Sequence, residues 1–276
     1  MLSRPDCTLA ANIFDPLSAR IAHMLEYEVC FLPGSVHKVA NLAVPDIVLV
    51  NMSDLVDVCR RITRIADVSL MHDGEDGFGN AVNVVRTVRE LEAAGVSAIE
   101  IEDAIPPSSF NQGNLGLYSE TEQVGKLEAA VAARTDRTTV IVSRTTALAQ
   151  FPLDEALDRI KAYSQTGVEA IRLAGLRTRG QLEAMHRATP LPLTVLSPPD
   201  DMMNDVPFLA ANGVSIVMVG NPAFGMAIQA IYVGFKHLKD GGVVEDLAPR
   251  EANANLLRQV NRTDEFIKLQ EQYLRN

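Results

Sequence analysis

The chain has 276 residues, of which 47% are hydrophobic and 22% are charged, and its formal net charge is −10. This length and composition predict either one large globular domain with a well-covered core or two small domains, and exclude a disordered chain. The acidic balance argues against nonspecific nucleic-acid binding, which requires clustered Lys and Arg. No apolar stretch reaches the length of a membrane span and no targeting segment is visible, so we expect a cytoplasmic protein that binds no membrane.

Cysteine and histidine usage predicts neither a disulfide framework nor a zinc site. The three cysteines, Cys7, Cys30 and Cys59, are odd in number and widely spaced, and none belongs to a C-x-x-C pair. The five histidines are scattered along the chain without the spacing of metal ligands. Any metal site would therefore have to be built from oxygen ligands.

Eight short apolar runs follow one another along the chain, and each ends at a polar residue, Gly or Pro. They lie at 8–14, 29–35, 68–75, 98–103, 138–144, 170–175, 193–198 and 215–220. Continuous apolar runs of this length are typical of parallel strands that are buried on both faces. The runs therefore predict eight strands of one parallel sheet.

Helical patterns separate these runs. Residues 15–28 offer Asp15 as an N-cap with Pro16 at the first helical position, and similar patterns occupy 79–95, 119–133, 152–167 and 178–188. Eightfold strand–helix alternation favours an α/β fold of the (β/α)8 TIM-barrel type, with residues 1–276 as a single domain. An open doubly wound sheet is the alternative, although no G-x-G-x-x-G follows the first strand.

Residues from about 236 to 276 form a C-terminal helical extension beyond the expected eighth helix. This extension is more polar than the preceding segments and carries apolar stripes. Such helices require apolar surface to cover, so the extension either packs on its own barrel or is exchanged with a neighbouring subunit.

Acidic residues gather where the third and fourth predicted strands end. They are Asp73, Glu75, Asp76, Glu100, Glu102 and Asp103. Barrel enzymes carry their sites at these strand ends, and Asp46, after the second strand, would join the same end. Residues 73 and 75 share one side of an extended strand, as do 100 and 102. An all-oxygen set suits Mg²⁺ or Mn²⁺ better than zinc, whereas a solvated acidic rim or helix caps would be the structural alternative.

Two further positions point to an anionic ligand. Gly34 and Ser35 follow the second strand, where backbone N–H groups either hold a carboxylate or form an ordinary turn. Arg144 ends the fifth strand, where an unpaired buried guanidinium would be costly. It therefore faces either an acid such as Glu102 or an anionic substrate.

The stretch "DGEDGFGN" at 73–80 resembles the D-x-D-x-G-[YF]-G-N metal loop of the isocitrate lyase / phosphoenolpyruvate mutase superfamily. "FDPLSARIA", "GSV", "VPD", "NVVRTVRELEAAGVSAIEIED" and "VSRTTA" follow the family's order, so the resemblance covers about residues 10–235. It is closest to the oxaloacetate decarboxylase-like subgroup. The resemblance implies a TIM barrel that binds Mg²⁺ and a small 2-oxo or 2-hydroxy acid, in a dimer or homotetramer with exchanged helices.

The resemblance also assigns roles to residues. It implies that Asp73 ligates the metal directly, and that Glu75, Glu102 and Asp46 lie further out. Gly34 and Ser35 would grip the substrate carboxylate, and Arg144 would neutralise the bound acid and its developing enolate. At the ends of strands seven and eight, Ser197 and Asn221 stand where the subgroup has Tyr and His; we assign Ser197 to substrate binding and Asn221, with Asp46, to catalysis.

Departures from the family pattern narrow the expected reaction. The loop at 104–120 has neither K-K-C-G, whose Cys serves the lyases as an acid, nor the Lys and Asn of the phosphonomutases. Glu75 replaces the family's second Asp, and Asp76 adds a charge. We expect a Mg²⁺-dependent lyase that cleaves a C–C bond of a 2-oxo or 2-hydroxy dicarboxylate, as in oxaloacetate decarboxylation. A phosphonopyruvate-type mutase or hydrolase, or a diverged ligand-binding barrel without activity, is the alternative.

Overall fold

The computed structural model describes residues 2–47, 49–107 and 116–274. The chain divides into two compact units, Met1–Asn221 and Pro222–Asn276. Residues 108–115 of the loop at 104–120 lie outside the described residues. The assignment of residues 1–276 to a single domain stays a prediction.

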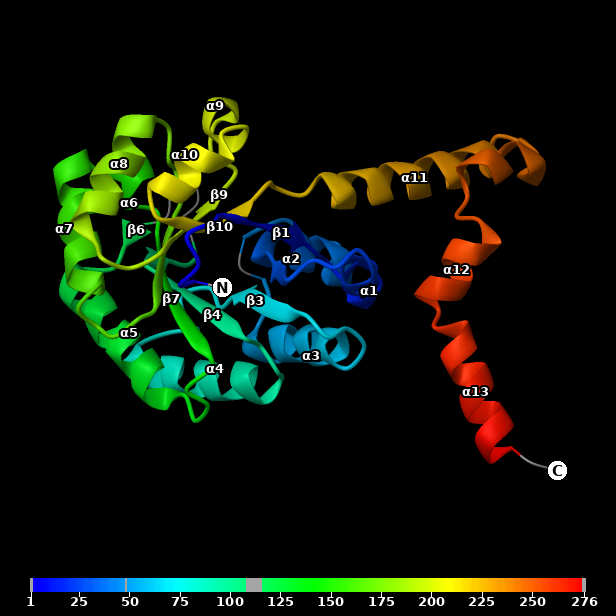
Figure 1. Cartoon of the computed structure of the whole chain (residues 1–276), viewed down its shortest axis with the longest axis horizontal. Coiled ribbons are helices and arrows are strands. Elements are labelled where there is room, and N and C mark those ends of the chain that lie inside the picture. The colour runs from blue at the N-terminus through cyan, green and yellow to red at the C-terminus, as the bar shows by residue number, and fades with distance from the viewer. Residues whose placement is uncertain (1, 48, 108–115, 275–276) are drawn as a thin grey trace. The chain divides into compact units, whose positions relative to one another are not determined.

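The first unit is a closed barrel of parallel strands (Figure 1). The strands are β1 (Thr8–Asn12), β2 (Val29–Leu32), β3 (Ser69–Asp73), β4 (Ala98–Glu102), β7 (Val140–Thr145), β8 (Ala170–Leu173), β9 (Leu193–Leu196) and β10 (Val214–Met218). The barrel closes because β1 pairs with both β2 and β10. Each predicted apolar run forms one of these strands, so the predicted (β/α)8 barrel is confirmed.

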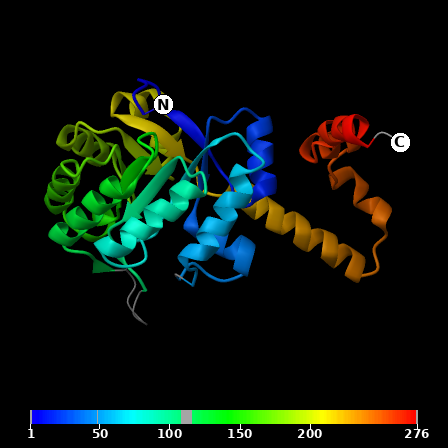
Figure 2. The same ribbon diagram turned by 90° about the horizontal axis from the view of Figure 1, so that it is seen from below.

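Helices surround the strands on the outside (Figure 2). They are α1 (Pro16–Met24), α2 (Gly34–Leu42), α3 (Met52–Thr63), α4 (Ala81–Ala93), α5 (Glu120–Ala133), α6 (Ala147–Gln150), α7 (Leu153–Tyr163), α8 (Arg179–Ala188), α9 (Asp200–Met203) and α10 (Val206–Ala211). The predicted cap of α1 is confirmed, since Asp15 accepts a hydrogen bond from the Ser18 amide at 2.7 Å. Two short strands, β5 (Ala104–Ile105) and β6 (Gly116–Leu117), pair in an antiparallel manner beside the barrel.

Side chains alternate between the two faces of each strand and so build two separate cores. On β4, Ile99 and Ile101 point outward and join the large apolar cluster between strands and helices. Glu100 and Glu102, which alternate with them, point to the barrel interior. The outer core is therefore apolar, whereas the upper interior of the barrel carries charge.

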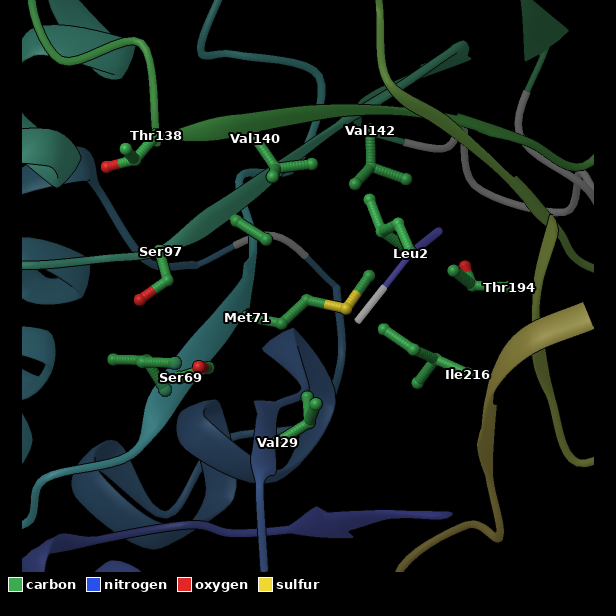
Figure 3. A pocket seen from close by; sticks show the side chains of 12 residues that line it. Leu2, Val29, Ser69, Met71, Ser97, Thr138, Val140, Val142, Thr194 and Ile216 are labelled. Atoms are coloured by element: carbon green, nitrogen blue, oxygen red, sulfur yellow. The ribbon is translucent and has the colours of Figure 1, made fainter. Parts of the chain in front are cut away.

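The lower end of the barrel interior is apolar. Met71, Val142 and Ile216 belong to a small inner cluster, and a cavity of about 170 Å³ lies among them (Figure 3). Leu2 and the strand starts at Ser69 and Ala98 also line this cavity. It lies at the N-terminal ends of the strands, the opposite end from the predicted site, where residues of TIM barrels serve stability.

A buried ion pair spans the interior above this apolar layer. Arg172, on β8, contacts Glu100, on β4, and both side chains are at most 1% exposed. The Arg172 guanidinium also stacks over the Phe31 ring, with 4.4 Å between its carbon and the ring centroid. Burial raises the pKa of Glu100 to about 7, and the positive charge of Arg172 opposes that shift. Arg172 and Glu100 neutralise each other, and either charge alone would be strongly destabilising in the barrel interior.

The second unit is helical. It contains α11 (Pro222–Lys239), two 3₁₀ turns, η1 (Val244–Asp246) and η2 (Ala248–Arg250), and the helices α12 (Ala254–Val260) and α13 (Thr263–Tyr273). None of the three α-helices contains a buried residue. In the described part of the chain, no helix combines the length and the apolar character that a membrane crossing requires.

We predict that Arg172→Met destabilises the barrel by about 3–5 kcal/mol, because it leaves the Glu100 carboxylate buried without a counter-charge. The double variant Arg172→Met with Glu100→Met removes both charges, so it should recover most of this loss. Urea unfolding of the two variants and the natural chain measures the effect. Equal stability of the single and double variants would contradict the role of the ion pair.

Candidate active site at the C-terminal end of the barrel

Three adjacent strands bring two carboxylates and one guanidinium together. Asp73 ends β3, Glu102 ends β4, and Arg144 lies on β7 directly beside Glu102 in register. The Arg144 Nη1 atom lies 2.5 Å from Asp73 Oδ2 and 3.1 Å from Glu102 Oε2. Glu102, the acid predicted to face Arg144, is therefore found beside it, and the same guanidinium nitrogen also contacts Asp73, which was not predicted as its partner.

The pKa values of Asp73, Glu102 and Arg144 depend on one another. Burial alone would raise the pKa of Asp73, but the Arg144 guanidinium holds it well below its usual range. Burial raises the pKa of Glu102 to about 7, against the opposing charge of Arg144. The nearby carboxylates in turn raise the pKa of Arg144 above its ordinary value, although burial opposes them. Arg144 thus stays cationic and keeps Asp73 ionised.

Glu75 and Asp46 meet at a different cation, Lys38 of α2. Lys38 Nζ lies 2.7 Å from Glu75 Oε1 and 2.6 Å from Asp46 Oδ1. Burial and the charge of Asp73 raise the pKa of Glu75 to about 7, and Lys38 opposes that shift. Glu75 and Asp46 were predicted at this end of the barrel. Lys38 was not, because it is a single charge within the short segment "GSVHKVAN".

Backbone geometry corrects the expected placement of Glu75. Strand β3 ends at Asp73, and Glu75 follows in the left-handed region at φ 54°, so residues 73 and 75 do not share one extended strand face. They are nevertheless close, because a Cβ on Gly34 would lie 2.8 Å from Glu75 Oε1 and 3.3 Å from Asp73 Oδ2. Glycine at position 34 therefore leaves room for both carboxylates.

Gly34 and Ser35 form the first turn of α2 and not a separate loop turn. The first N–H groups of a helix have no partner within the helix and favour negative charge. This turn lies beside Asp73 and Glu75 through Gly34. The N-terminus of α2 thus lies beside the acidic cluster, and the binding of a substrate carboxylate by Gly34 and Ser35 stays a prediction.

Ser197 and Asn221 lie on another part of the rim. Ser197 follows β9 in the left-handed region at φ 47°, and a Cβ on Gly220 would lie 3.2 Å from its Oγ atom. Asn221 Oδ1 accepts a hydrogen bond from Asn12 Nδ2, at the end of β1, at 3.0 Å. Among the described residues, neither side chain has a hydrogen bond to the Asp73 cluster. Asn12 was missed by the sequence analysis, since a single amide gives no pattern.

Asp76, the additional acid of the loop, turns away from Asp73. Its carboxylate accepts hydrogen bonds from the amides of Phe78 and Gly79 at 3.0 and 3.2 Å, and from the Tyr118 hydroxyl at 2.9 Å. Lys126 Nζ lies 3.4 Å from the same carboxylate and 3.6 Å from the centroid of the Tyr118 ring. Asp76 thus fastens the acidic loop to Tyr118, which directly follows β6, and to α5.

Two other acids expected at the site have structural partners. Glu100 lies deeper and pairs with Arg172, so it does not join Glu102 in one oxygen cage. Asp103 is fully buried on the outer side and accepts hydrogen bonds from Thr145 Oγ1 at 2.7 Å and the Tyr163 hydroxyl at 3.2 Å. A buried partner for Arg172 could have been predicted from the sequence, because Arg172 is a charged residue inside the apolar run "AIRLAG".

The donor set fits a hard divalent cation by its chemistry. Asp73, Glu75, Glu102 and Asp46 supply only carboxylate oxygens, the ligands that Mg²⁺ prefers. In the described part of the chain, however, no three acidic, His or Cys groups stand together in a cage that could hold a metal ion. The carboxylates point instead to Arg144 and Lys38.

The barrel with a charged cluster at its C-terminal strand ends has the architecture of a TIM-barrel enzyme. Residues 1–239 match the phosphoenolpyruvate phosphomutase family. The chain belongs to this family.

Individual relatives agree with the family assignment. An oxaloacetate decarboxylase of Rhodopseudomonas palustris (strain BisA53) is 39% identical over 264 residues, which cover 96% of this chain and 91% of the relative. A solved phosphoenolpyruvate phosphomutase from Streptomyces platensis subsp. rosaceus superposes with a TM-score of 0.88 at 28% identity, covering 99% of this chain and 97% of the other. A phosphonopyruvate hydrolase in complex with oxalate and Mg²⁺ gives a TM-score of 0.86 at 28% identity, covering 99% and 96%.

We predict that Asp76→Asn destabilises the barrel by about 2–3 kcal/mol, because it leaves the buried Lys126 ammonium without its counter-charge. Tyr118→Phe is the matched control, since it removes one hydrogen bond to the same carboxylate and should cost only about 1 kcal/mol. Chemical denaturation measures both. A smaller loss for Asp76→Asn than for Tyr118→Phe would show that the ion pair does not fasten the loop.

Proposed function

We propose that this chain is a Mg²⁺-dependent lyase that cleaves a C–C bond of a small 2-oxo dicarboxylate, with oxaloacetate decarboxylation as its reaction. The observation that carries the proposal is the cluster of Asp73, Glu102 and Arg144 at the strand ends. The 39% identity to an oxaloacetate decarboxylase over nearly the whole chain supports this choice of substrate.

Arg144 and the first turn of α2 provide the positive potential for the substrate. We assign one substrate carboxylate to the backbone N–H groups of Gly34 and Ser35, which lie beside the acidic cluster. Arg144 can then donate to the 2-oxo oxygen or its carboxylate with the N–H groups that do not face Asp73 and Glu102. Ser197 and Asn221, on the opposite strands, are assigned to the distal end of the substrate.

Loss of CO₂ leaves the bonding electron pair on an enolate, so the site must stabilise negative charge on the former 2-oxo oxygen. A preorganised guanidinium such as Arg144 does so at no reorganisation cost. Mg²⁺ held by Asp73, with Glu75, Glu102 and Asp46 further out, would supply Lewis-acid stabilisation of the same charge. The step requires no acid for bond breaking, and the enolate takes its proton from solvent.

Phosphonopyruvate cleavage is the second candidate. The barrel superposes on a phosphonopyruvate hydrolase over almost its whole length. Both substrates share the 2-oxo acid end that Arg144 and Gly34 would hold, and they differ at the distal end. Phosphorus NMR of phosphonopyruvate incubated with the protein distinguishes the two reactions.

We predict that the purified protein forms pyruvate from oxaloacetate with Mg²⁺ faster than buffer with Mg²⁺ does, and that EDTA removes this rate. Asp73→Ala should lower kcat/KM at least about 100-fold, because it removes the central ligand of the cluster. Asp158→Ala, which changes an exposed acid of α7, is the matched control and should retain activity. Equal pyruvate formation with and without EDTA would contradict a metal-dependent reaction.

We also propose that the chain forms a homo-oligomer, a dimer or tetramer, through the second unit. Large apolar side chains of α11 are exposed, among them Met226 at 72% and Phe235 at 73%. Exposed apolar side chains at this density are typical of protein interfaces. A dimer that covers α11 would explain why this helix has an apolar side.

We predict that Phe235→Asp shifts the chain towards a smaller species in size-exclusion chromatography with light scattering, because a charge on this face opposes its burial. Lys239→Glu, an exposed change on the same helix, is the control and should leave the mass unchanged. A monomeric natural chain at micromolar concentration would contradict the proposal.

A further inference from the structure

Lys38 is the least expected charge in the site. It lies in the middle of α2, its side chain is only 2% exposed, and its ammonium group contacts carboxylates that belong to the acidic cluster. Burial alone would lower the pKa of this lysine, but the charges of Glu75 and Asp46 raise it. A buried lysine kept cationic by two acids is a fixed positive charge within the barrel mouth.

The two internal cations divide the four carboxylates between them. Arg144 contacts Asp73 and Glu102, whereas Lys38 contacts Glu75 and Asp46. Each carboxylate that would surround a divalent cation therefore already has a counter-charge from the chain. The Lys38 ammonium contacts carboxylate oxygens of the kind that a hard metal ion binds.

Glu75 suits this arrangement. Its left-handed backbone at φ 54° directs the side chain out of the strand line, and glutamate is one methylene longer than aspartate. Its Oε1 atom is 2.7 Å from Lys38 Nζ and would lie 2.8 Å from a Cβ on Gly34. The longer acid at 75 and the lysine at 38 thus fit each other.

We propose that Lys38 is a built-in cation of this site, which competes with a divalent metal for Glu75 and Asp46 and sets a low metal affinity. The proposal rests on the proposed function in so far as the same carboxylates are the metal site. It adds that Lys38 retains Glu75 and Asp46, so that Asp73, with Glu102 further out, is left to hold the metal.

The physical consequence is electrostatic repulsion between the Lys38 ammonium and a divalent cation bound at the site. An ammonium within a few ångströms of a bound divalent cation opposes binding, and it also withholds two negative charges that would favour it. Removal of the ammonium without loss of the carboxylates should therefore strengthen metal binding. If the lysine only stabilised the conformation of the loop, its loss would displace the metal ligands and weaken metal binding.

The test is calorimetric titration of the substrate-free protein with Mn²⁺ and with Mg²⁺ at pH 8. We expect Lys38→Met to bind Mn²⁺ at least about tenfold more tightly than the natural chain. Lys38→Arg keeps the charge and should remain within about threefold. Lys161→Met, which removes the same charge from an exposed ion pair with Asp158, controls for net charge and should also remain unchanged.

Lys38→Gln serves as a second variant if Lys38→Met does not fold, because the amide still donates a hydrogen bond to either carboxylate. A larger rise in Tm on addition of Mn²⁺ for Lys38→Gln than for the natural chain would support the proposal. Unchanged, weaker or absent Mn²⁺ binding in the folded neutral variants would overturn it. No turnover of oxaloacetate combined with tighter binding in Lys38→Met would refute only the proposed reaction.

Discussion

The neutralisation of carboxylates inside the barrel mouth is the constraint on which the rest of this structure depends. Asp73 and Glu102 lie close enough to share one guanidinium nitrogen, and Glu75 and Asp46 share one ammonium. Carboxylates that close raise each other's pKa unless cations lie among them. Arg144 and Lys38 meet this requirement from opposite sides, one from a strand and one from a helix.

The same constraint orders the barrel interior from one end to the other. Apolar side chains such as Met71 and Val142 line the N-terminal end and its cavity. The Glu100–Arg172 pair follows, fully buried and compensated within the chain. At the top, Arg144 is 18% exposed, whereas Lys38 is only 2% exposed, so of these two cations only the guanidinium remains partly accessible. The number of charged side chains in the interior therefore increases toward the C-terminal ends of the strands, where the candidate active site lies.

The fold was predictable because its signals are local and repeated. Eight apolar runs of similar length, separated by capped amphipathic segments, specify a parallel barrel almost independently of any one residue. The positions of Asp73, Glu102 and Arg144 followed from the same logic, since parallel strands end at one edge. The partners of the acids did not follow, because a sequence pattern shows which residues end a strand but not which side chains meet across the barrel. Glu100 illustrates this limit: its strand position was predicted, and its partner Arg172 comes from two strands away.

The structure changes the interpretation of two charged residues, Lys38 and Asp76. In the sequence, Asp76 adds a third acid to "DGED", yet its carboxylate accepts a hydrogen bond from Tyr118 and pairs with Lys126. Its charge therefore belongs to the framework of the loop and not to the site. Lys38 lies in a segment that reads as an ordinary helix, yet its ammonium lies within the acidic cluster. Lys38 on α2 and Arg144 on β7 thus offset part of the negative charge of the four carboxylates, and the acids alone would overstate its magnitude.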